Sequence, residues 1–140
     1  MVPINFLAVL VSAVAAMAIG AVWYGPLFGK EWARGMGLSP QGLQEAMKRS
    51  GAKSYSVMAV GAFLMAFILD HTIAYGSMYL GISGIAAGLI FGFASWLGFI
   101  APATINSVIW ENKPVRFWLI TSGYYLVTIL VMSVILGSWA

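Results

Sequence analysis

The sequence predicts an all-α integral membrane protein: a four-transmembrane-helix bundle with a short cytoplasmic amphipathic helix between the first two spans. Hydrophobic residues make up 61% of the chain and charged residues only 8%, whereas soluble domains carry about 25% charged residues. The chain also contains four apolar segments that each approach or exceed the ~20 residues a membrane helix needs. With 140 residues, we expect a single membrane domain covering residues 1–140.

The four spans are placed by their apolar runs and by the residues that interrupt them. We expect the first over about residues 4–24, ending at Gly25-Pro26 because proline lacks an amide proton. No Lys or Arg precedes this run, so we expect an uncleaved span rather than a signal peptide. The second span is predicted over about 55–75, followed by a tight connection at 76–81. The third is predicted over about 82–109, kinked at Pro102, and the fourth over about 115–136.

The polar segment over about residues 28–53 is expected to hold a short helix. Ser39 is a typical N-cap and Pro40 suits the first helical position. The helix then runs to about Ser50, where Gly51 suits the C-cap. Its apolar and charged residues fall on different faces, which fits either a helix on the membrane surface or a solvated loop helix. The candidate contacts to lipid headgroups are Lys48, Arg49 and Lys53.

Charge predicts the orientation. All seven Lys and Arg residues lie in or beside the connections between spans one and two and between spans three and four. The positive-inside rule therefore places both connections in the cytoplasm and both termini outside, in the cytoplasmic (inner) membrane. We attribute the basic excess to this orientation and expect membrane lipids, not nucleic acid, as partners. Across the second basic connection, Glu111 is expected to pair with Lys113 or Arg116.

Composition and motifs restrict the chemistry. The chain has no cysteine and one histidine, which excludes disulfides, thiolate sites and a multi-histidine metal site within one subunit. No phosphate-binding loop, nucleophile elbow or zinc-protease motif is present. We therefore expect no enzyme activity, no metal and no cofactor.

Small residues recur at spacing four on two spans. In lipid, helices associate largely through such residues, because they let backbones approach closely. The faces comprise Ala8, Ser12, Ala16 and Gly20 on the first span and Gly84, Gly88 and Gly92 on the third. Whether these contacts form within or between subunits is left open by the pattern. Because four short helices leave little room for a cavity, we expect a homo-oligomer.

Five polar residues form the candidate intramembrane site: Asp70, His71, Thr104, Asn106 and Tyr124. Ionisable residues in spans are costly and commonly functional. Asp70 continues the face of Ala62 and Ala66, and with His71 it could carry protons or bind a cation; alternatively, both lie at the outer headgroups. Thr104 and Asn106 follow Pro102 and either bond a neighbouring helix or contribute to a substrate site.

Two stretches resemble a known family. They are AVWYGPLFGK at residues 21–30 and GFIAPATIN at residues 98–106, accompanied by Asn5, Glu111 and the Gly123-Tyr124-Tyr125 triplet. Together they resemble a family of small bacterial membrane proteins catalogued as a domain of unknown function, family 1761. The resemblance implies four helices in a bacterial membrane and brings no known activity or site residues.

Two functions follow from these features. One is a homo-oligomeric transporter, channel or sensor for a small solute or ion, suggested by the glycine face, Pro102 and the Asp70–His71 pair. The other is a structural or accessory membrane protein that binds lipid or a larger membrane partner through residues 28–53.

Overall fold

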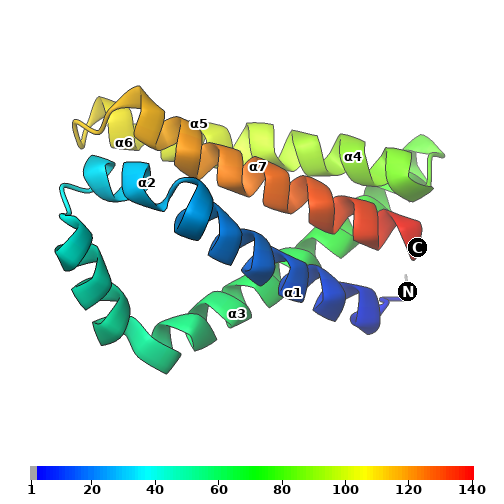
Figure 1. Ribbon diagram of the computed structural model, residues 1–140. Helices are drawn as coiled ribbons and strands as arrows, with labels where there is room; N and C mark the ends of the chain where they lie inside the picture. The colour runs from blue at the N-terminus through cyan, green and yellow to red at the C-terminus, as the bar shows by residue number, and fades with distance from the viewer. Residues whose placement is uncertain (1–2) are drawn as a thin grey trace.

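The computed structural model describes residues 3–140, and within them all regular structure is helical. Four helical stretches are long and apolar enough to cross a membrane: Phe6–Leu27, Pro40–Leu80, Gly84–Ile109 and Val115–Ser138. The two described chain ends lie at one end of the bundle (Figure 1), and the basic connections lie at the other. The predicted all-α fold with four span-like helices is therefore confirmed.

The first span continues past its predicted end. α1 (Phe6–Val22) begins where Asn5 Oδ1 accepts a hydrogen bond from the Ala8 amide at 3.2 Å. It passes into a π-helix, η1 (Trp23–Leu27), with Pro26 inside it. The prediction that Gly25-Pro26 ends the span is wrong, because the wider π-turn accommodates a proline without breaking the helix. A short helix that the sequence did not predict, α2 (Gly29–Gly35), follows.

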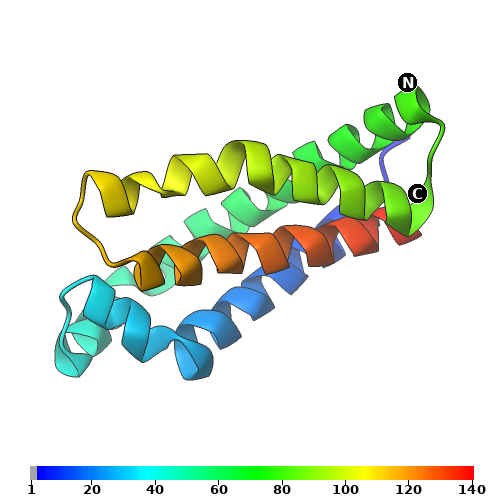
Figure 2. The same cartoon turned by 90° about the horizontal axis from the view of Figure 1, so that it is seen from above.

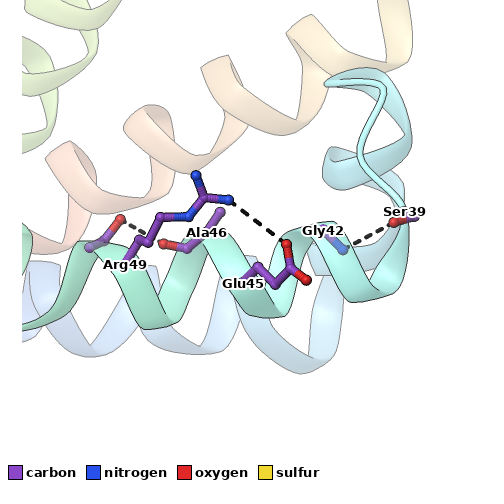
Figure 3. A network of polar contacts seen from close by, with 6 residues as sticks. Ser39, Gly42, Glu45, Ala46 and Arg49 are labelled. Carbon is purple, nitrogen blue, oxygen red and sulfur yellow. Dashed lines mark hydrogen bonds and ion pairs between the residues drawn. The ribbon is translucent and has the colours of Figure 1, made fainter.

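α3 (Pro40–Leu80) joins the predicted cytoplasmic helix to the second span. Ser39 caps it as predicted, because its Oγ accepts a hydrogen bond from the Gly42 amide at 3.0 Å (Figure 3). Gly51 leaves the helical conformation at φ 45° and ψ −153°, so α3 consists of two helices that meet at a kink, and the short helix ends at Gly51 as predicted. The predicted connection at 76–81 is helical to Leu80, and Gly81 closes the helix at φ 67°.

The third span is a series of short helices. It comprises α4 (Gly84–Ser95), the π-helix η2 (Trp96–Ile100), α5 (Ala101–Thr104) and α6 (Asn106–Ile109). The predicted irregularity at Pro102 is present as the π-turn that immediately precedes the proline's helix. α7 (Val115–Ser138) then returns to the end that holds the chain termini, as a single 24-residue helix.

The small-residue faces pack within the chain. Ala8, Ser12, Ala16 and Gly20 are all buried. A Cβ placed on Gly88 would meet the Ser133 carbonyl oxygen, and one on Gly92 would meet the Ser133 hydroxyl. Gly84, with φ 69° at the first residue of α4, also faces α7, because a Cβ on Gly137 would lie 2.6 Å from the Gly84 carbonyl oxygen. The contact that the sequence left open is therefore made between α4 and α7 of one chain.

Two tryptophans attach α7 from neighbouring spans. Each π-helix begins with a tryptophan whose indole N–H donates to a backbone carbonyl of α7. Trp23 Nε1 lies 2.9 Å from the Ile120 oxygen, and Trp96 Nε1 lies 2.9 Å from the Ser122 oxygen. α7 is thus hydrogen-bonded to both η1 and η2. The core of the bundle also includes Ala62, Ala66, Leu69 and Ile73 of α3.

Candidate functional site

A cavity of about 560 Å³ opens at the end of the bundle that holds the chain ends. We call it the terminal cavity. The beginning of α1, the later turns of α3, the turn before α4 and the end of α7 line it. Its wall is mostly apolar, and the side chains that can interact with a polar ligand are Asn5, Asp70, Ser77, Ser83 and Trp139.

Asp70 is the only charged side chain that lines the terminal cavity. It follows the buried Ala62 and Ala66 on one face of α3, and Ala74 on the next turn also lines the cavity. This spacing turns the carboxylate toward α1 and α7, as the pattern predicted. α3 continues ten residues beyond Asp70 to Leu80, or about 15 Å of helix, so the carboxylate does not lie at the helix end.

His71 is not part of this cavity. Its Nδ1 lies 2.7 Å from the Phe67 carbonyl oxygen of its own helix. Its ring stands between those of Phe67 and Tyr75, at centroid distances of 4.5 and 6.3 Å. Within residues 3–140 no hydrogen bond or ion pair joins Asp70 to His71. The predicted pair is therefore not assembled, because consecutive residues on a helix point about 100° apart.

The other three predicted polar residues lie elsewhere along the bundle. Thr104 donates to the Ile100 carbonyl at 2.7 Å and accepts from Trp118 Nε1 at 3.1 Å, which makes it a contact between α5 and α7. Asn106 is exposed and donates locally, to the Ala103 carbonyl at 3.2 Å. Tyr124 packs on Gly20, where an added Cβ would lie 3.2 Å from its hydroxyl. Thr104 and Tyr124 thus make contacts between helices, Asn106 bonds only locally, and none of the three lines the cavity with Asp70.

Several residues of the terminal cavity were not predicted. Asn5, Ser77, Ser83 and Trp139 each look ordinary in the sequence, two of them near chain ends and two in a connection. The topology could have indicated this site. With four spans, both chain ends lie on the same side as the connection between the second and third spans. Polar residues near those three segments were therefore candidates for one site.

The opposite end carries the basic residues. Arg116 pairs with Glu31 at 2.7 Å, linking α7 to α2, so the predicted partner Glu111 is wrong for Arg116. Arg49 and Glu45 form a longer, exposed pair of 3.8 Å on the first turns of α3 (Figure 3). Lys48, Arg49 and Lys53 are all exposed, as headgroup contacts need to be.

α3 has an exposed stretch between its bend and the bundle. Residues 55–61 are exposed at every position, so they have no packed face in this chain. Tyr55, Val57 and Val60 expose 56, 65 and 59% of their surface. In Figure 1 this part of α3 diverges from α1 toward the basic end, and Figure 2 shows α3 crossing obliquely behind the other helices. We call residues 55–61 the free segment.

Together, the fold and the spans define a small all-helical protein with four helices of membrane-spanning type. The family described as "Protein of unknown function (DUF1761)" matches residues 7–137, and the chain belongs to this family. No curated protein and no solved structure matches the chain. Within residues 3–140, no three His, Cys, Asp or Glu side chains gather into a potential metal site.

Proposed function

We propose that this protein binds a small polar solute in the terminal cavity and acts as a sensor or as the binding part of a carrier. In this proposal it resides in the inner membrane of a bacterium with its chain ends outside. The observation that carries it is Asp70: the one acidic residue away from the basic end lines the terminal cavity. A carboxylate in a mostly apolar cavity is a typical recognition group for a small ligand.

The packing below the cavity favours binding over free passage through one chain. Val9, Ser12, Met132 and Ser133 are fully buried, with 0% exposure, between α1, α4 and α7. Close packing of this kind leaves no room for a hydrated path. The proposal is therefore a site that is loaded from one side, not an open channel within a single bundle.

The test fills the terminal cavity with a side chain. Ala74 lines the cavity, so Ala74→Trp occupies it, whereas Ala86→Trp places the same indole on an exposed position of α4. In lipid nanodiscs, a panel of amines, amino acids and sugars is screened for an increase in melting temperature. We expect wild type and Ala86→Trp to respond to the same solute and Ala74→Trp not to respond. An equal response in all three proteins would refute the cavity as the site.

A second candidate function is structural: homo-oligomer assembly through the free segment. Apart from Ser56, its side chains are apolar or aromatic yet unpacked, and Gly61 has no atom within 4 Å of the position of an added Cβ. An exposed glycine on a membrane helix allows close approach of a second helix. We infer that the free segments of two copies pack against each other in a symmetric contact.

The absence of cysteine makes this contact easy to test. Val57→Cys places a thiol on the free segment, and Val14→Cys places one on an equally exposed part of α1. Under mild oxidation in membranes, we expect covalent dimers for Val57→Cys and few for Val14→Cys. Equal cross-linking would show random encounters, and a Val57→Cys adduct of a different mass would instead identify another membrane partner.

The basic end is proposed to contact anionic lipid. Lys48, Arg49 and Lys53 lie at the bend that leads into the free segment. Each basic residue near an anionic leaflet contributes about 1 kcal/mol. Replacing all three with Gln is expected to reduce co-purification of phosphatidylglycerol relative to phosphatidylcholine, measured by mass spectrometry of extracted lipid. An unchanged lipid ratio would remove this contact from the proposal.

A further inference from the structure

The two ends of the bundle differ in charge. All seven Lys and Arg residues and three of the four acidic residues lie at the basic end, which leaves it with a formal charge of +4, because seven minus three is four. At the other end Asp70 is the only Asp, Glu, Lys or Arg side chain that lines the terminal cavity. His71 turns toward the Phe67 carbonyl and is not among the lining residues. Among the side chains of residues 3–140, a ligand in this cavity therefore meets the Asp70 carboxylate and no cationic partner.

The polar groups of the cavity are too few for a divalent metal ion. Ca²⁺ takes about 6–8 oxygen ligands and Mg²⁺ needs a near-octahedral set. The cavity side chains offer one carboxylate, two hydroxyls and the Asn5 amide, whose oxygen already accepts the Ala8 amide proton. The volume of about 560 Å³ also greatly exceeds that of a bare ion. A cation with its own apolar substituents fits this wall better.

Trp139 provides the second recognition element. It lines the same cavity as Asp70 and is 44% exposed, so part of its indole surface is accessible. Indole faces attract organic cations, and alkylammonium groups in particular are bound by a carboxylate and an aromatic ring together. The remaining wall, which includes Ile73 and Leu136, is apolar and suits the substituents of such an ion.

We propose that the ligand of the terminal cavity is a small organic ammonium ion, held by Asp70 through charge and by Trp139 through cation–π attraction. This inference rests on the function proposed above, since it names the class of solute that the same cavity binds. An anionic solute is disfavoured by the Asp70 carboxylate, and a neutral one lacks the charge attraction to it.

The experiment uses three probes of similar shape and different charge: tetramethylammonium, tert-butanol and pivalate. Binding to the full chain in nanodiscs is measured by saturation-transfer NMR and titration calorimetry. We expect tetramethylammonium to bind and the other two not to. Asp70→Asn is expected to weaken tetramethylammonium binding at least tenfold, and Trp139→Leu at least threefold. Glu111→Gln, at the exposed basic end, is the matched control and should bind as wild type does.

A second variant tests the same inference without replacing Asp70, in case Asp70→Asn fails to fold. Ser83→Lys adds a positive charge at an exposed position of the cavity wall and leaves Asp70 in place. We expect it to keep its melting temperature and to lose tetramethylammonium binding. If tert-butanol or pivalate binds as well as tetramethylammonium, or if both charge variants bind it normally, the ammonium inference is overturned. The cavity-filling test with Ala74→Trp is independent of ligand charge, so it separates this failure from failure of the proposed function.

Discussion

A close backbone contact between α4 and α7 gives the sharpest test of the packing in the bundle. Gly88 of α4 faces the Ser133 backbone, and a Cβ there would meet the Ser133 carbonyl oxygen and lie 3.0 Å from the carbonyl carbon. A backbone carbonyl cannot rotate away, so Gly88→Ala forces α4 and α7 apart. Inserting a methyl group into a well-packed core typically costs about 1–3 kcal/mol, and the better helix propensity of alanine offsets about 1 kcal/mol of this.

We therefore expect Gly88→Ala to lower the free energy of unfolding by up to about 2 kcal/mol. Gly61→Ala is the matched control, because Gly61 is also helical and no atom lies within 4 Å of an added Cβ. Its free energy of unfolding should stay unchanged or rise by up to about 1 kcal/mol. Gly92→Ala should fall between them, since the Ser133 hydroxyl that it meets can rotate.

The assay is equilibrium unfolding by SDS in mixed micelles, followed by circular dichroism and tryptophan fluorescence. A Gly88→Ala protein at least as stable as Gly61→Ala would refute the reasoning. It would mean that the α4–α7 contact is looser than the structure describes, or that the two helices move apart without a loss in the free energy of unfolding.

Three further predictions concern single contacts and orientation. Trp23→Phe removes the indole hydrogen bond to α7 and should lower the free energy of unfolding in the same assay by about 0.5–1.5 kcal/mol; an unchanged value would show that this bond does not hold the helices. Glu31→Gln should lower the free energy of unfolding by only about 0–1 kcal/mol, because its partner Arg116 is 73% exposed. The double variant Glu31→Arg with Arg116→Glu should recover the wild-type free energy of unfolding, and no recovery would argue against the ion pair. In intact cells, an impermeant maleimide should label Ser83→Cys and not Ser50→Cys, because the positive-inside rule places the basic end in the cytoplasm. The opposite labelling pattern would show that the orientation is the reverse of the one proposed.

The sequence predicted the number and the order of the span-like helices, because hydropathy acts over whole segments. It misplaced their ends where prolines were involved. Pro26 was expected to end a helix, yet a π-turn carries the chain through it. Sequence rules treat proline as a helix breaker because they consider only neighbouring residues. In the structure, Trp23 at the start of η1 also donates a hydrogen bond to α7, a contact between distant segments that such rules do not include.

The candidate site was predicted in part. The face shared by Ala62, Ala66 and Asp70 correctly turned the carboxylate toward other helices, since helical spacing fixes direction. The partner was wrong, because adjacency in sequence suggested His71, whereas adjacency in space supplies Asn5 and Trp139. Contacts between distant segments depend on helix rotation and tilt, which one sequence does not specify. The same limit explains why Arg116 was assigned to Glu111 and pairs with Glu31.

The two indole bonds to α7 have a mechanical consequence for α3. Among residues 3–140, hydrogen bonds cross from η1 to α7, from η2 to α7 and from α7 to α5, whereas none connects α3 to another helix. α3 is therefore held to the bundle by side-chain packing, through its buried Ala62, Ala66, Leu69 and Ile73. It carries Asp70 in this packed part and Lys53 beside the Gly51 kink. The carboxylate of the terminal cavity and the basic residues at the kink thus share the one long helix whose position depends on shape complementarity rather than on hydrogen bonds to its neighbours.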